Sequence, residues 1–124
     1  MVSHLDKKNS PIMVDIGGKN ITQRIAEAEG EVIFDKNSFK KIESLKSKKG
    51  SIKNIAIIAG IMGAKETSKL MPLCHNIPID AVTIEIIKNI KKNSMKVRAI
   101  VKTSSKTGVE MEALTAVSIS CLTI

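Results

Sequence analysis

Apolar and polar residues alternate along two segments in the second half of the chain. Residues 82–86 (VTIEI) and 95–102 (MKVRAIVK) carry apolar side chains at alternate positions. This period is typical of β-strands that bury one face. The polar residues 91–94 (KKNS) between them suit a tight turn. The pattern therefore predicts a β-hairpin.

The first third of the chain contains two further strand candidates. Residues 12–16 form a short run closed by two glycines, and they predict a strand. Residues 22–34 are ambiguous, because an Ala-Glu-Ala triplet favours helix whereas the later Val-Ile-Phe run favours strand. We interpret them as an extended strand. The polar residues 1–11 are expected to form a flexible arm ahead of a single domain, residues 12–124.

Three segments favour helix. Asp35 is a suitable N-cap for a short amphipathic helix. Ser51 would cap a longer helix that ends at about Met71, before a proline. The last helix is expected to begin at Thr107 and to run to Ile124. Strands and helices in this order predict an α+β fold.

The second helix is apolar on nearly all sides. Its large apolar residues are Ile52, Ile55, Ile57, Ile58, Ile61 and Met62. Such a helix is expected to be buried on several sides. Gly60 and Gly63 leave a bare patch where another backbone can approach closely.

The composition limits the classes of function. Aromatic residues make up 2% of the 124 residues, so the stacking platforms of single-strand nucleic-acid binders are missing. The net charge of +8 fits either an anionic partner or a solvated basic surface. Two cysteines are too few for a disulfide framework. With neither an apolar leader nor a run long enough to span a membrane, we expect a soluble, cytoplasmic protein.

A basic loop, Lys48-Lys49-Gly50-Ser51, precedes the second helix. A helix N-terminus carries unpaired N–H groups and a partial positive charge, so two adjacent lysines would suit a phosphate. The residues do not follow the order of a Walker motif. A solvated loop with a serine cap is the alternative explanation, and these four residues alone favour it.

Two acids stand at the start of the last helix. Thr107 and Glu110 have the spacing of a capping box, in which Glu110 would be structural. Glu112 lies about 200° further round a regular helix. One of the two acids should therefore face the core or an interface, where a carboxylate is costly unless it is paired or functional.

The tripeptide Leu73-Cys74-His75 follows the end of the second helix. The histidine suits proton transfer or phosphate contact, although a structural role fits a lone histidine too. Adjacent Cys and His side chains do not make a zinc site. Lys65, late in the same helix, either extends to solvent or points into a site. Together these groups suit acid–base chemistry on a phosphorylated small molecule.

Several blocks of sequence carry a family resemblance. They are Met13-Val14-Asp15, Lys49-Gly50, Ile58-Ala59-Gly60-Ile61 with Ala64-Lys65, Leu73-Cys74-His75, and the run from Lys106 to Ala116 (KTGVEMEALTA). Over residues 12–124 the chain resembles the MoaC family, the cyclic pyranopterin monophosphate synthases of molybdenum cofactor biosynthesis. The resemblance implies a ferredoxin-like fold and a homohexamer of three dimers, with active sites at the dimer interfaces.

The resemblance also implies a reaction and the residues that perform it. The implied lyase converts 3′,8-cyclo-7,8-dihydroguanosine 5′-triphosphate to cyclic pyranopterin monophosphate and releases pyrophosphate, and it needs no redox cofactor. No metal-ligating residue is assigned, and the sequence leaves open whether magnesium accompanies the triphosphate. Catalytic roles would fall to Lys49, Lys65 and Glu110. Substrate contacts would fall to Leu73, Cys74, His75, Met111, Glu112 and Arg24, of which Arg24 has the poorest matching surroundings.

The end of the chain departs from the family pattern. The family continues beyond the position of Ile124 with a catalytic aspartate and, three residues later, a catalytic lysine. Residues 113–124 form an apolar helix pattern without a stop signal. We therefore expect the C-terminal part of the domain to be missing, and the site of the 124-residue form to be incomplete.

Two other functions stay open. A non-catalytic assembly partner of the family would explain the missing end. A basic nucleic-acid-binding module is favoured by the net charge, but the shortage of aromatic residues and arginine opposes it.

Overall fold

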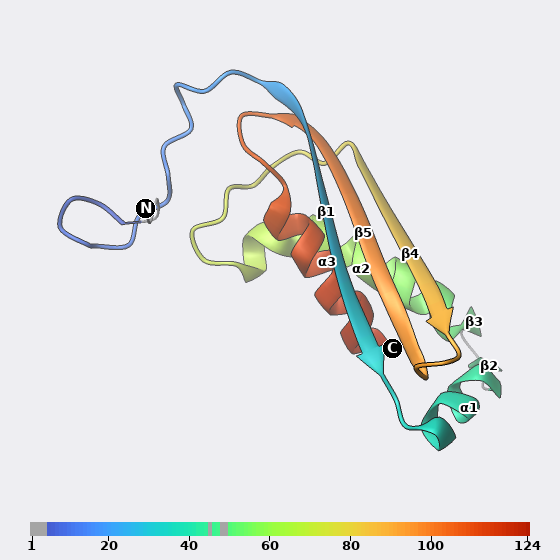
Figure 1. Cartoon of the computed structure of the whole chain (residues 1–124). Coiled ribbons are helices and arrows are strands. Elements are labelled where there is room, and N and C mark those ends of the chain that lie inside the picture. Colours follow the sequence, from blue (N-terminus) through green and yellow to red (C-terminus); the bar gives the residue numbers. More distant parts are fainter. Residues whose placement is uncertain (1–4, 45, 48–49) are drawn as a thin grey trace.

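Three antiparallel strands form the main sheet of the computed structural model, which describes residues 5–44, 46–47 and 50–124 (Figure 1). The strands are β1 (Thr22–Ile33), β4 (Ala81–Asn89) and β5 (Ser94–Ser105). Their order is β1-β5-β4, so β5 is central. Ala99 of β5 pairs with Ala28 of β1 and with Ile84 of β4, which sets the register. The predicted hairpin and the extended conformation of residues 22–34 are confirmed.

Two long helices cover one face of this sheet. These two helices are α2 (Ile52–Leu70) and α3 (Glu110–Thr123). A shorter helix, α1 (Lys36–Ser44), follows β1. The short strands β2 (Lys46–Ser47) and β3 (Gly50–Ser51) pair with each other between α1 and α2. Helix α3 packs against β1 and β5, whereas α2 packs against β4 (Figure 1). The arrangement is the predicted α+β fold of ferredoxin-like type.

Side-chain caps start the first two helices, as predicted. Asp35 Oδ1 accepts a hydrogen bond from the backbone N–H of Ser38 at 2.7 Å. Ser51 Oγ accepts one from the backbone N–H of Asn54 at 3.1 Å. These bonds satisfy donors that a helix start would otherwise leave unpaired. Within the described ranges, no helix is long and apolar enough to span a membrane.

Two local predictions are wrong. Residues 12–16 are irregular and have no ladder partner among the described residues. The last helix begins at Glu110 rather than Thr107, and the capping box is not formed, because Val109 is the N-cap and makes no side-chain cap bond. Ser105 Oγ donates to the carbonyl oxygen of Thr107 at 2.7 Å. This bond holds Thr107 in the turn between β5 and α3.

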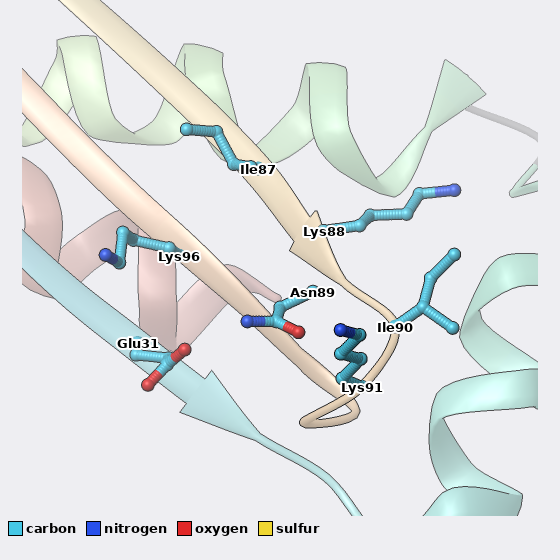
Figure 2. A pocket seen from close by; sticks show the side chains of 7 residues that line it. All are labelled: Glu31, Ile87, Lys88, Asn89, Ile90, Lys91 and Lys96. Atoms are coloured by element: carbon cyan, nitrogen blue, oxygen red, sulfur yellow. The ribbon is translucent and has the colours of Figure 1, made fainter.

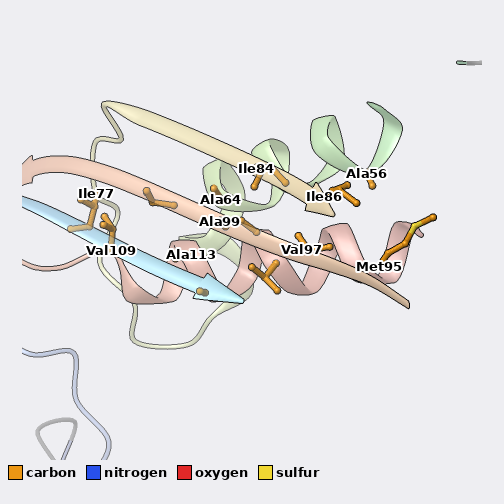
Figure 3. Packing of buried hydrophobic residues seen from close by; sticks show 14 of the residues in the cluster. Ala56, Ala64, Ile77, Ile84, Ile86, Met95, Val97, Ala99, Val109 and Ala113 are labelled. Carbon is orange, nitrogen blue, oxygen red and sulfur yellow. The ribbon is translucent and has the colours of Figure 1, made fainter. Parts of the chain in front are cut away.

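The core lies between the sheet and the two long helices (Figure 3). Along β5, Val97, Ala99 and Val101 are fully buried, which is the alternation that the sequence predicted. Ala64 of α2 and Ala113 of α3 pack into the same cluster. Small and β-branched side chains therefore fill this part of the core.

Helices α2 and α3 approach each other closely at Gly60. A Cβ atom at this position would overlap Ser120 Oγ and lie 3.1 Å from the carbonyl oxygen of Ala116. Ser120 Oγ donates across the contact to the carbonyl oxygen of Ala56 at 2.8 Å. The bare patch predicted from Gly60 is thus the place where the two helices meet.

Candidate functional site

A small cavity lies where the chain leaves α2 and where α3 begins. Its volume is about 140 Å³. The residues that line it are Leu73, Cys74, His75, Ile77, Thr107, Gly108, Glu110, Met111 and Glu112. Two segments that are distant in sequence therefore meet at one site.

The loop after α2 is fixed at both of its ends. The backbone N–H of Met71 donates to the carbonyl oxygen of Thr67 at 2.9 Å, which closes the last turn of α2. At the other end, the backbone N–H of Asp80 donates to the carbonyl oxygen of Lys102 at 2.8 Å. Between them Leu73 has a φ of 62°, a left-handed conformation that is rare for a bulky side chain. The chain thus accepts local strain where it turns to deliver Cys74 and His75.

The ring of His75 is held by the N-terminal segment. Its Nε2 atom lies 2.5 Å from the carbonyl oxygen of Val14. Because a carbonyl oxygen only accepts hydrogen bonds, Nε2 must carry the proton. In the neutral ring the lone pair then lies on Nδ1, which is the atom able to accept a proton.

The first turn of α3 brings two acids to the cavity. Gly108 precedes them, and a Cβ atom there would overlap the carboxylate of Glu110. Glycine therefore leaves the space that the Glu110 side chain occupies. Since Val109 supplies no side-chain cap, the positive end of the helix faces these acids directly.

Glu112 is the inward-facing acid that the helical spacing predicted. Its side chain is buried, with 3% of its surface exposed, whereas Glu110 is exposed. Burial raises the pKa of Glu112, and the charge of Glu110 raises it further. A bond from the backbone N–H of Glu112 opposes this rise. The cavity thus holds a carboxyl group whose protonated form is favoured more than that of an exposed one.

The thiol of Cys74 lies in the electrostatic field of this acid. Burial is the main cause that raises the pKa of Cys74, and the negative charge of Glu112 raises it further. Cys121 on α3 is the other free cysteine, and burial alone raises its pKa. Both thiols are therefore poor nucleophiles at neutral pH.

This coupling predicts how Cys74 reacts. In a Glu112→Gln variant the negative charge is lost, so the pKa of Cys74 should fall and its alkylation by iodoacetamide at pH 8 should become several-fold faster. Peptide mass spectrometry over time would measure both thiols in the same sample. The rate at Cys121 should stay unchanged and serves as an internal control. Equal acceleration at both thiols would instead indicate general loosening of the fold.

The sequence profile of the MoaC family matches residues 13–124. The chain belongs to the MoaC family. A protein of Helicobacter pylori strain Shi470, named cyclic pyranopterin monophosphate synthase, is 50% identical over 123 residues, which cover 99% of this chain and 78% of the relative. A protein of the same name from Campylobacter jejuni serotype O:23/36 is 49% identical over the same shares of both chains.

The residues expected from the MoaC resemblance do not all lie at the cavity. Those that line it are Leu73, Cys74, His75, Glu110, Met111 and Glu112. Arg24 does not line it, and its guanidinium lies 3.4 Å from the carbonyl oxygens of Ser105 and Lys106, which precede the lining residue Thr107 in the chain. Lys65 is exposed on α2 and is not part of the lining. Lys49 falls outside the described residues.

Two contributors escaped the sequence reasoning in this member of the MoaC family. Ile77 forms an apolar wall of the cavity, and the carbonyl oxygen of Val14 binds His75. Ile77 stands in the irregular segment 74–79, where no periodicity marks a buried side chain. A backbone carbonyl leaves no signal in a sequence at all.

A larger hollow of about 420 Å³ lies near the β4–β5 turn, away from the cavity between the loop after α2 and the start of α3 (Figure 2). Lys88, Lys91 and Lys96 line it, together with Glu31. The carboxylate of Glu31 accepts a hydrogen bond from Ser94 Oγ at 2.7 Å. None of the described residues that line this hollow is implied by the MoaC resemblance, so its size alone does not make it the candidate site.

Proposed function

We propose that the chain is a cyclic pyranopterin monophosphate synthase, which acts on 3′,8-cyclo-7,8-dihydroguanosine 5′-triphosphate and releases pyrophosphate. The observation that carries the proposal is the meeting of Glu112 with Cys74 and His75 around one cavity, in a chain that belongs to the MoaC family. The names of the relatives support the same reaction.

The chemistry of the cavity suits a guanine-derived ring. A carboxylate accepts hydrogen bonds only, so ionised Glu112 would bind the ring through its N–H groups. Ring rearrangement needs groups that take up and return protons. The Nδ1 atom of His75 and the exposed carboxyl of Glu110 are proposed for these transfers.

The triphosphate needs positive charge, which the two acids of the cavity cannot supply. We assign it to Lys49 and Lys65, following the family resemblance. Cations that face a departing pyrophosphate stabilise the charge that develops on it. Lys65 does not line the cavity of its own chain, so in this proposal it acts at the cavity of another copy.

A second copy of the chain could place Lys65 of one copy at the cavity of the other. The cavity of about 140 Å³ is smaller than the roughly 300 Å³ and more that ligand sites usually offer. Met111 at its rim is 41% exposed, and α2 exposes Ile58 and Met62 one turn apart. We propose that this helical face packs against another copy, so that Lys65 of one chain serves a neighbouring cavity. The homohexamer implied by the resemblance is one assembly that would do so.

Charge placed on the helical face should therefore break the assembly. Ile58→Lys is expected to lower the sedimentation coefficient of the protein at micromolar concentration, because a lysine at a buried contact costs far more than one in water. Ile87→Lys is a matched control on the exposed face of the sheet, since Ile58 and Ile87 are 59% and 54% exposed. Dissociation by the control and not by Ile58→Lys would place the interface on the sheet instead.

The test of the proposed function begins with the coding DNA after the Ile124 codon. If it encodes an aspartate and, three residues later, a lysine, the longer chain is assayed; otherwise the 124-residue chain is assayed. Pyrophosphate release from the cyclic triphosphate is the expected result, and Lys49→Ala should abolish it. Binding of the triphosphate without turnover would favour the non-catalytic alternative, and absence of both would refute the proposal.

A further inference from the structure

The N-terminal segment touches the surroundings of the cavity at two points. The carbonyl oxygen of Val14 accepts the hydrogen bond from Nε2 of His75, 61 residues later in the chain. The carbonyl oxygen of Gly17 lies 3.5 Å from Nζ of Lys106, which follows β5. Two backbone carbonyls, three residues apart, thus face two side chains near the site.

The backbone that carries these carbonyls has little regular support. Residues 12–16 form no ladder with any described strand, so the position of Val14 is not fixed by a sheet. A carbonyl that orients an imidazole ring must itself be held in a fixed position. A local interaction must therefore hold the backbone of Val14 in place.

Asp15 supplies it. Its Oδ1 atom accepts a hydrogen bond from the backbone N–H of Gly17 at 2.8 Å, and this closes a turn between the two carbonyls. The backbone N–H of Lys19 then donates to the carbonyl oxygen of Ile16 at 3.1 Å, which continues the turn. A Cβ atom at Gly17 would lie 3.1 Å from Asp15 Oδ1, so the residue beside the carboxylate is tightly placed.

We infer that Asp15 is a positioning residue for His75. By closing the turn, its carboxylate holds the Val14 carbonyl where it binds the Nε2 proton, and it thereby keeps the lone pair of the neutral ring on Nδ1. Asp15 itself does not contact the cavity. The inference rests on the proposed function only for the consequence in catalysis; the effect on the ring is a property of the free protein.

The ring can be observed directly by nitrogen-15 histidine NMR without substrate. His4, the other histidine, is replaced by glutamine throughout, so that one imidazole remains. The protein should show Nε2 protonated and a slowly exchanging Nε2–H signal. Asp15→Ala should lose that signal, whereas Asp15→Asn should keep it, because an amide oxygen still accepts from Gly17. Asp15 is exposed, so removal of its carboxylate takes no packing from the fold.

Asp6 provides a matched control. Its Oδ1 atom accepts hydrogen bonds from the backbone N–H groups of Lys8 and Ser10 at 2.8 and 2.9 Å, so it closes a similar turn. Asp6 is not one of the residues that line the cavity. Asp6→Ala should leave the signal of His75 unchanged. Gly17→Ala, which crowds Asp15 Oδ1, should weaken the signal and gives a second perturbation of the same bond.

The outcomes separate this inference from the proposed function. An unchanged Nε2–H signal in Asp15→Ala, or an Nδ1-protonated ring in the starting protein, would overturn the positioning role whatever the activity. If the signal is lost as expected, Asp15→Ala should also lower kcat by roughly 10- to 100-fold, with rescue by Asp15→Asn. Loss of the signal in a protein that shows no synthase activity at all would refute the proposed function and leave the positioning role standing.

Discussion

Glu112→Gln should produce a protein that is more stable at neutral pH and nearly inactive. The pKa of Glu112 is raised mainly by burial, so the folded chain holds this proton more tightly than the unfolded chain does. The stability that the group contributes is therefore complete below its unfolded-state pKa and is lost as the pH rises through its folded-state pKa. At neutral pH the buried charge is a cost, and the neutral amide removes it. We expect a gain of about 1 kcal/mol, with a loss of pyrophosphate release of about 100-fold or more.

Thermal unfolding from pH 4 to pH 8 would measure the stability part of this prediction. The difference between the variant and the starting protein should widen as the pH rises, and it should be small at pH 4. Glu110→Gln serves as the control for stability, because Glu110 carries the same charge two residues earlier but is exposed. An equal gain in both variants would point to general charge repulsion at the start of α3 rather than to the burial of Glu112.

Gly60→Ala is expected to destabilise the fold by roughly 2–4 kcal/mol, although alanine favours helix more than glycine does. The added Cβ would overlap Ser120 Oγ and crowd the carbonyl oxygen of Ala116, which lies 3.1 Å away. The overlap is relieved when Ser120 Oγ turns away or when α2 and α3 separate, and either movement breaks the bond from Ser120 to Ala56. Such a loss is a large part of the roughly 5–15 kcal/mol that holds a domain together.

Gly63→Ala is the matched control, one turn further along α2. Its new Cβ would lie 2.9 Å from Cγ1 and 3.1 Å from Cβ of Ile119, and the nearest backbone atom, the carbonyl oxygen of Thr115, lies 3.5 Å away, so the overlap is milder than at Gly60. Urea unfolding should show a change of about 1 kcal/mol or less for Gly63→Ala, in either direction. Equal midpoints for the two variants would mean that the helices have room to adjust at Gly60 as well.

The sequence predicted those parts of the fold in which a local residue pattern is compatible with only one kind of secondary structure. The alternation in residues 95–102 admits a strand with one buried face, and Val97, Ala99 and Val101 are buried accordingly. Asp35 and Ser51 lie where helix N-termini need acceptors, and both are caps. The strand expected at residues 12–16 failed because a strand needs a partner, and the pairing partner of a short segment cannot be read from its own residues.

The sequence predicted only part of the candidate site. Helical spacing alone indicated that one acid of the pair Glu110 and Glu112 points inward, and Glu112 does. Nothing local indicated that His75 would find its partner in the backbone of Val14. The capping box failed because a competing bond from Ser105 held Thr107 in the preceding turn. A contact across 61 residues decided the outcome for His75, whereas a bond across two residues decided it for Thr107.

The bond between His75 and Val14 has a consequence for how the site comes into being. Its partners lie on either side of β1, α1 and α2 in the chain, so it closes a loop of 61 residues that contains much of the fold. Closing so large a loop is entropically unfavourable until the elements inside it have packed. The imidazole therefore reaches its working orientation only after the sheet and helices have come together. A partly folded or nicked chain with nearly complete secondary structure would still lack an oriented histidine, which ties chemical competence to completion of the tertiary structure.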